Sequence, residues 1–296
     1  RSWIDKQLRG IKNPVLRKDA EKKYEYENSS YLYKVFAILK SIYGVDIQPL
    51  AVEISKLRFF LTLIVDQMID DSKPNRGVSS LPNLAFNFIA ANSLIRLKES
   101  RNGYEIREAV VQDWTYLNSE SHFDGLNVLR EEYFATDSIE EKVKISEEFK
   151  KRQKLLANEI IDNQLTDTNI IKITNWNPFS DEPTDWFEPK WMFGIENGFD
   201  IVIGNPPYIQ LQRNGGLLAR KYEDEDYQTF ARTGDIYCLF YERGLSLAKK
   251  NGLLCYITSN KWMRTDYGRK LRNYLSYYNP LLLIDLGGNV FKEATV

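Results

Sequence analysis

The sequence has few of the residues that bind metals or form disulfides. Its 296 residues include one histidine and two cysteines. A single histidine, His122, cannot supply a histidine-based catalytic system, so an isolated role is the better interpretation. Cys238 and Cys255 have no CxxC partner and fall in apolar patterns, which indicates reduced core thiols of a cytoplasmic protein. We therefore predict no metal site and no disulfide.

Charge of one sign and long apolar runs are also missing. The chain carries 40 basic and 41 acidic residues, so its bulk charge does not attract nucleic acid and any DNA contact must be local. No signal peptide and no apolar run of membrane-spanning length is visible, so we expect no membrane partner. The hydrophobic share of 43% is enough for a sizeable core, in one large domain or two modest ones.

The most informative stretch is residues 199–208, where a strand pattern runs into an Asn-Pro-Pro-Tyr corner. Residues 201–203 form a continuous apolar run, which is typical of a parallel strand covered on both faces. Gly204 and two prolines end this run, at the carboxyl end of a strand, where open α/β sheets bind ligands. The corner is therefore a candidate site.

The hydrogen-bonding groups of this corner suit an aminated planar substrate. The side-chain oxygen of Asn205 and the carbonyl of Pro206 could accept both hydrogens of an –NH₂ group. The ring of Tyr208 offers a face on which a planar base can stack. A plain strand-ending turn is the alternative, because prolines commonly punctuate loops.

A strand followed by a helix is predicted near the start of the chain. Residues 42–46 read as a short strand that ends in Asp46, and Pro49 stands at a helix start. Apolar residues then recur on one predicted helix face, at Leu50, Ile54, Leu57, Leu61 and Ile64. A carboxylate at such a strand end can accept hydrogen bonds from ribose hydroxyls, so Asp46 is a cofactor candidate. The alternative is an acid stabilised by the helix dipole.

A further strand, with a polar tip, is predicted at residues 86–90. The run stops at Asn92 and Ser93. An amide at this position could accept from an adenine amine and donate to a ring nitrogen, although an Asx-turn is a strong competitor.

The remaining segments suggest a division into three parts. Residues 100–170 carry a long polar helical pattern, which predicts a helical insertion between core parts at 1–99 and 171–296. A polar, mobile loop is expected after Tyr208, around Gly215 and Gly216. A helix over 235–250 and strands over 253–258 and 281–284 complete the pattern. Three basic residues follow the predicted strand at 253–258: Lys261, Arg264 and Arg269. They are candidates for contacts with DNA phosphates, and a solvated helix face is the alternative.

Four segments together resemble a known family. They are residues 43–51 (YGVDIQPLA), 90–94 (AANSL), 198–208 (GFDIVIGNPPY) and 290–296 (VFKEATV). Their order and spacing are similar to the methylase region of large type IIG restriction-modification enzymes and related phage-defence methylases. The resemblance implies an α/β fold with a helical insertion, namely the Rossmann-like fold of methyltransferases that use S-adenosylmethionine as the methyl donor. It also implies methyl transfer to N6 of an adenine flipped out of double-stranded DNA.

The resemblance assigns roles to individual residues. Asp46 matches the ribose-binding acid, and Ile47 would pack on the adenine of the cofactor. Asn92 and Ser93 lie at the tip where many such enzymes carry an aspartate that reads this adenine. Phe291 matches an aromatic residue that backs the target base. A target-recognition domain, and in some cases a nuclease, would belong to the same longer polypeptide.

One expected feature is missing, and alternatives stay open. Residues 1–43 contain no glycine-rich loop of the kind that lets backbone approach a nucleotide cofactor. We therefore expect a fold incomplete at its N-terminal side and weak binding of S-adenosylmethionine by this chain alone. The Asn-Pro-Pro-Tyr corner is also similar to that of methyltransferases acting on a protein glutamine or on RNA. A non-catalytic fragment that binds DNA or a partner is the third possibility.

Overall fold

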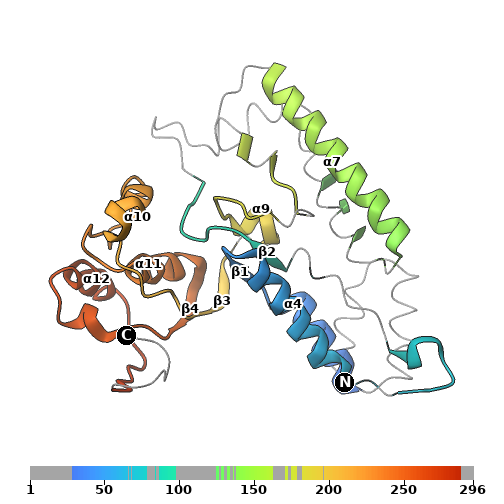
Figure 1. Cartoon of the computed structure of the whole chain (residues 1–296), viewed down its shortest axis with the longest axis horizontal. Coiled ribbons are helices and arrows are strands. Elements are labelled where there is room, and N and C mark those ends of the chain that lie inside the picture. Colours follow the sequence, from blue (N-terminus) through green and yellow to red (C-terminus); the bar gives the residue numbers. More distant parts are fainter. Residues whose placement is uncertain are drawn as a thin grey trace. The chain divides into compact units, whose positions relative to one another are not determined.

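The computed structural model describes residues 29–65, 67, 69–78, 84, 87–97, 125–126, 128–129, 132–133, 136, 138–162, 171–172, 175–178, 182–195 and 197–287. The chain divides into two compact units (Figure 1). The first comprises Arg1–Asn92 and Leu97–Asp185, and the second comprises Ser93–Arg96 and Trp186–Val296. The three-part division at residues 99 and 170 stays a prediction.

The first unit contains a small parallel sheet. Strand β1 (Gly44–Asp46) pairs with β2 (Phe88–Ala90), with Val45 opposite Ile89. Both strands were predicted from the sequence, and both are confirmed. Thr184 continues the sheet at the other edge of β2, because its N–H donates to the carbonyl of Ala90 at 2.9 Å and its carbonyl accepts from Asn92 at 3.0 Å.

Two helices pack with this sheet. Helix α3 (Ser29–Ser41) and helix α4 (Pro49–Ile64) form a core with Leu84 and Phe88. The buried amide of Asn87 donates to the carbonyls of Leu39 at 3.1 Å and Ile42 at 3.0 Å, and so binds the otherwise unpaired end of α3. Helix α4 begins with Pro49 in its first turn, as predicted.

The buried face of α4 differs from the predicted one. Val52 and Leu63 are buried, whereas the predicted stripe is exposed at Leu50, Ile54, Leu57 and Leu61. The helix is apolar on more than one face, and the sheet and α3 select the face that contains Val52. A short 3-10 helix, η1 (Pro74–Gly77), follows. Within the predicted insertion, α7 (Ile139–Asp162) is a helix of 24 residues.

The second unit contains the other parallel pair. Short helix α9 (Pro189–Phe193) leads to β3 (Phe199–Gly204), which pairs with β4 (Ala248–Tyr256) so that Gly204 lies opposite Tyr256. Helix α11 (Tyr237–Leu247) packs beside these strands (Figure 1). The packing is close at Gly244, where an added Cβ would lie 2.7 Å from the Cδ1 atom of Leu254. Parallel pairing is thus confirmed in both units.

Several sequence expectations about this unit are wrong. Strand β3 is not covered on both faces, because Ile201 and Ile203 are 60% and 75% exposed. Helix α11 ends at Leu247 rather than at residue 250, since β4 already begins at Ala248. Residues 281–284 form no strand and are exposed, because they have no strand partner among residues 197–287. Of the two thiols, Cys238 is buried as expected, but Cys255 is exposed.

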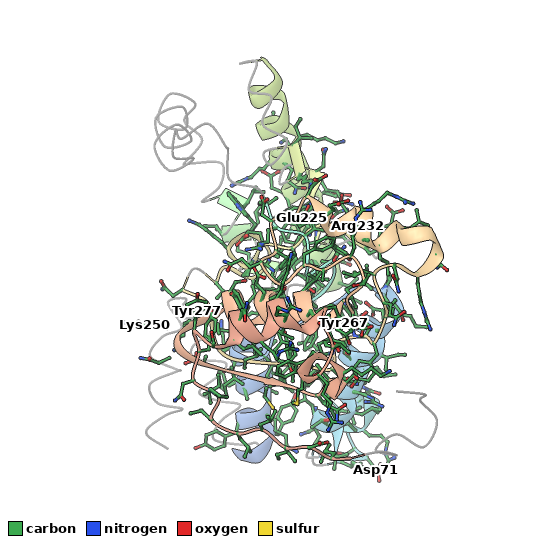
Figure 2. All side chains as sticks on the ribbon, turned by 90° about the vertical axis from the view of Figure 1, so that its left-hand side faces the viewer. Asp71, Glu225, Arg232, Lys250, Tyr267 and Tyr277 are labelled. Carbon is green, nitrogen blue, oxygen red and sulfur yellow. The ribbon has the colours of Figure 1, made fainter. Side chains whose placement is uncertain are left out.

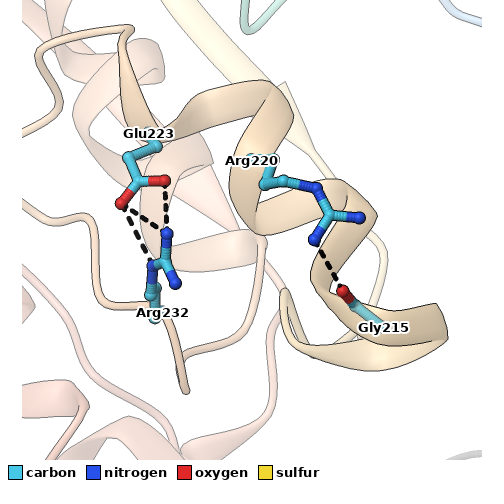
Figure 3. A network of polar contacts seen from close by, with 4 residues as sticks. All are labelled: Gly215, Arg220, Glu223 and Arg232. Carbon is cyan, nitrogen blue, oxygen red and sulfur yellow. Dashed lines mark hydrogen bonds and ion pairs between the residues drawn. The ribbon is translucent and has the colours of Figure 1, made fainter.

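The segment after Tyr208, expected to be a loop, contains a helix, α10 (Arg213–Glu223). Its first turn holds three residues with positive φ, Asn214, Gly215 and Gly216. Arg220 closes this turn by donating a hydrogen bond to the carbonyl of Gly215 at 2.9 Å (Figure 3). Arg232 donates hydrogen bonds to both carboxylate oxygens of Glu223. The hydrogen bond from Arg232 lowers the pKa of Glu223.

The unit closes with η2 (Asn260–Met263) and α12 (Gly268–Leu275). Tyr267 directly precedes α12, and Tyr277 follows its other end (Figure 2). Among the helices that the structure describes, none has the length and apolar character needed to cross a bilayer.

Candidate active site

The Asn-Pro-Pro-Tyr corner lies where β3 ends. The carbonyl of Gly204 accepts from the N–H of Ile257 at 3.2 Å, so the strand pairing runs up to the corner. Asn205 is then exposed, Pro206 is buried and Tyr208 is half-buried. No backbone N–H of the described residues donates to the carbonyls of Asn205 or Pro206. These two carbonyls therefore keep their acceptor capacity, and the role of the corner in binding an –NH₂ group stays a prediction.

The hydroxyl of Tyr208 contacts two acceptors. It lies 3.2 Å from Oδ1 of Asn205 and 3.3 Å from the carbonyl oxygen of Ile257. Burial raises the pKa of this hydroxyl, which therefore keeps its hydrogen at neutral pH. Because it has one hydrogen, it can donate to only one of the two at a time.

One buried aromatic residue, Tyr237, contacts the ring of Tyr208 and is itself hydrogen-bonded to a half-buried tyrosine. The ring of Tyr237 meets that of Tyr208 in a T-shaped contact, with centroids 6.2 Å apart and planes at 88°. The hydroxyl of Tyr237 lies 2.9 Å from that of Tyr267, which in turn donates to Oδ2 of Asp235 at 2.8 Å. Residues that follow β3, that lie at the start of α11 and that directly precede α12 are thus brought together at this corner.

The cofactor candidates of the first unit lie at neighbouring strand ends. Asp46 is the last residue of β1, and its carbonyl accepts from the N–H of Ala91 at 2.9 Å. Its Oδ1 accepts from the N–H of Gln48 at 2.8 Å, which leaves Oδ2 for another donor. Ile47 is 52% exposed beside it, and Asn92 is buried at the end of β2.

Ser93 lies in the second unit, and a side chain of that unit forms a hydrogen bond with its backbone. Its carbonyl accepts from Nε of Arg243 at 2.7 Å. The side chain of Arg243 is buried, and Nη2 also donates to the carbonyl of Phe187 at 2.8 Å. Burial lowers the pKa of Arg243, but these carbonyls and the ring of Phe187 still stabilise its charge.

The phosphate candidates follow the carboxyl end of β4, the strand paired with β3. Lys261, Arg264 and Arg269 are all exposed. Arg269 forms an ion pair with Asp266 at 3.0 Å. Lys261 and Arg264 form no salt bridge with the described residues, so their charges are the more available of the three. Phe291 lies outside the described residues.

Comparison with known proteins identifies the family. The family model described as Eco57I restriction-modification methylase matches residues 40–291, a span that contains all these candidates. The chain belongs to that family. No solved structure matches it significantly.

Curated relatives agree with membership of the Eco57I methylase family. The type II restriction enzyme and methyltransferase RM.Eco57I of Escherichia coli is 35% identical over 101 residues, 33% of this chain and 10% of the relative. The putative type II restriction enzyme and methyltransferase RM.MjaORFECS2P of Methanocaldococcus jannaschii is 27% identical over 276 residues, 78% of this chain and 23% of the relative. The adenine-specific methyltransferase PglX of Lacticaseibacillus casei is 29% identical over 99 residues, 33% of this chain and 8% of the relative. The matches thus cover at most 23% of the length of these relatives.

Sequence reasoning missed four residues that are linked, directly or through one another, to the candidate site residues of this Eco57I-type methylase. Asp235, Tyr237 and Arg243 fall in a predicted helix, where a tyrosine or a charge is usually a packing or surface residue. Tyr267 stands in a polar turn. The nearest signal was the Gly-Asp-Ile-Tyr run at 234–237, because its acid and its ring immediately precede an apolar helix.

Proposed function

We propose that this chain carries the catalytic region of an adenine-N6 DNA methyltransferase that uses S-adenosylmethionine, within a restriction-modification or phage-defence enzyme. Membership of the Eco57I methylase family and the names of the curated relatives support this proposal. The observation that carries it is the corner at the end of β3, where Asn205 and Pro206 present acceptors beside the ring of Tyr208. The proposed whole fold is Rossmann-like, and both parallel strand pairs with their helices suit it.

The chemistry follows from what the corner can bind. A paired adenine has its amine engaged, so the base must leave the duplex before reaction. Oδ1 of Asn205 and the carbonyl of Pro206 would then accept the two N–H hydrogens, while Tyr208 stacks on the base. Prior deprotonation is not required. The acceptors orient the nitrogen lone pair and favour the positive charge that develops on nitrogen.

The described residues fit the proposed cofactor. Oδ2 of Asp46 remains available for a ribose hydroxyl, and the exposed side chain of Ile47 suits the face of an adenine. Asn92 and Ser93, at the end of the neighbouring strand, would contact the adenine edge. When bound, S-adenosylmethionine supplies an electrophilic methyl group. Phe291 would back the target base.

The proposed substrate is double-stranded DNA, and Lys261 and Arg264 would contact its phosphates. Both follow β4, which is paired with the strand that ends at the corner. Such contacts position the duplex without reading its sequence. Sequence recognition is assigned to a target-recognition domain of the same polypeptide.

Substitution of Asn205 tests the proposal. In the natural polypeptide that contains this chain, Asn205→Ala should lower the rate of adenine methylation in duplex DNA at least ~10²-fold, because one preorganised polar group is lost. Transfer of a labelled methyl group from S-adenosylmethionine, followed by nucleoside analysis, measures this rate. Asn273→Ala is a matched control, because Asn273 is an exposed residue of α12. Methylation of RNA or of a glutamine peptide, with DNA left unmodified, would contradict the assignment.

A further inference from the structure

The backbone on either side of the corner is locked into one arrangement. The N–H of Leu211 donates to the carbonyl of Gly234, and the N–H of Ile236 donates to the carbonyl of Ile209, each at 2.9 Å. Between these bonds, Gln210 and Asp235 form an antiparallel bridge. The segment directly after Tyr208 is therefore fixed against the segment directly before Tyr237.

This backbone register places the two rings in contact. Tyr237 has an exposed fraction of 0%, and its ring stands at 88° to that of Tyr208. A T-shaped pair is favourable only while edge and face remain aligned. Rotation of the Tyr237 ring would therefore remove the support of the Tyr208 ring.

A chain of hydrogen bonds fixes the orientation of Tyr237. Because Tyr267 donates its only hydroxyl hydrogen to Oδ2 of Asp235, Tyr237 must be the donor in its own bond to Tyr267. Burial raises the pKa of both hydroxyls, so both keep their hydrogens. Asp235 is 7% exposed and accepts at the end of the chain. The donor and the acceptor are thus determined in both hydrogen bonds, from Tyr237 to Tyr267 and from Tyr267 to Asp235.

We propose that Tyr237 is a positioning residue for base stacking, and that Asp235 and Tyr267 act through it. The inference rests on the proposed function, because it takes Tyr208 to be the ring on which the flipped base stacks. The bonds from Asp235 to Tyr237 hold the stacking face of Tyr208 ready before the base arrives. Ordering this ring in advance lowers the cost of capturing a flipped base.

The first test compares two tyrosines of α11. Tyr237→Phe keeps the ring but removes the bond to Tyr267, and it should lower kcat/KM for adenine methylation about tenfold. Tyr241→Phe is the matched control, because it also loses one hydroxyl bond, to Thr258, while its ring packs on Tyr256 and Trp262. The control should stay within about twofold of the natural enzyme although its stability also falls.

Base capture can be measured separately from chemistry. With 2-aminopurine at the target position, Tyr237→Phe should reduce the fraction of flipped base in the DNA complex, whereas Tyr241→Phe should not. Tyr267→Phe should reproduce the effect of Tyr237→Phe, because it breaks the same chain. Equal effects of Tyr237→Phe and Tyr241→Phe on flipping would show that Tyr237 is a structural residue only.

A third measurement needs no DNA. Fluorotyrosine placed at position 208 alone should give one ¹⁹F resonance in the natural polypeptide and a broadened or split resonance in Tyr237→Phe. An unchanged ¹⁹F spectrum would overturn the positioning role even if methylation is confirmed. Absence of adenine methylation in the natural enzyme, together with a changed ¹⁹F spectrum, would refute the proposed function and leave the ring geometry supported.

Discussion

The guanidinium of Arg243 donates its Nε hydrogen to the carbonyl oxygen of Ser93 at 2.7 Å. The next two carbonyls are bound as well. Leu94 accepts from the hydroxyl of Tyr227 at 2.6 Å, and Ile95 accepts from the N–H of Phe187 at 2.9 Å. Three consecutive carbonyls after the tip of β2 are thus held by other segments of the second unit.

This arrangement predicts a large effect of Arg243→Met. The substitution leaves the carbonyls of Ser93 and Phe187 without their charged donor, so the free energy of unfolding should fall by about 2–4 kcal/mol. Because Ser93 is a proposed cofactor contact, the Kd for S-adenosylmethionine should rise as well. Urea unfolding and titration calorimetry on the natural polypeptide measure the two effects.

Arg272→Met provides the control for Arg243→Met. Arg272 also donates to two carbonyls, those of Trp262 and Thr265, but it holds the turn before α12. The Arg272→Met substitution should lower the free energy of unfolding without changing the affinity for S-adenosylmethionine. The coupling between Arg243 and the cofactor site is refuted if both variants bind the cofactor as tightly as the natural protein.

Substitutions of Tyr208 should separate its ring from its hydroxyl. Tyr208→Ala removes the stacking face, which is worth about 1–3 kcal/mol per base, and should be severe. Tyr208→Phe keeps the face and loses only the bond shared between Asn205 and Ile257, so activity should fall a few-fold at most. Methylation rates of the two variants, measured side by side, decide this. Equal losses would mean that the hydroxyl, not stacking, is the main contribution.

The sequence predicted local elements better than their surroundings. The apolar runs and Pro49 located β1, β2, β3 and α4, because these signals depend on neighbouring residues. The exposure of Ile201 and the buried face of α4 depend on which other elements cover them, and no local pattern contains that information. Residues 281–284 show the same limit, since a strand-like composition forms a strand only with a partner.

The candidate site was predictable where one short segment carries it. Asn205, Pro206 and Tyr208 are neighbours in sequence, so their acceptors and ring could be read together. Tyr237 and Tyr267 stand 29 and 59 positions after Tyr208, and only the fold brings Tyr237 to its ring and Tyr267 to the hydroxyl of Tyr237. The hydrogen bond from Arg243 to the carbonyl of Ser93 joins residues 150 positions apart, so no local sequence pattern could predict it.

The two cysteines should differ sharply in reactivity. Burial raises the pKa of the Cys238 thiol to about 12, so at pH 8 only roughly one thiol in ten thousand is the reactive thiolate. Cys255 is exposed on β4. Iodoacetamide at pH 8 should therefore modify Cys255 in the folded protein and Cys238 only after denaturation. Peptide mass spectrometry with and without denaturant gives both readings, and early labelling of Cys238 would show that α11 is less tightly packed than described.

The salt dependence of DNA binding should distinguish the basic residues. Each phosphate contact that is removed should lower the slope of log K against log salt by about 1. We expect this change for Lys261→Gln and for Arg264→Gln, because neither side chain forms a salt bridge with the described residues. Arg269→Gln should change the slope less, since its charge is already paired with Asp266 at 3.0 Å. Binding of a non-specific duplex to the natural polypeptide at several salt concentrations measures all three. If Arg269→Gln changes the slope most, the phosphates run along α12 rather than past the turn that follows β4.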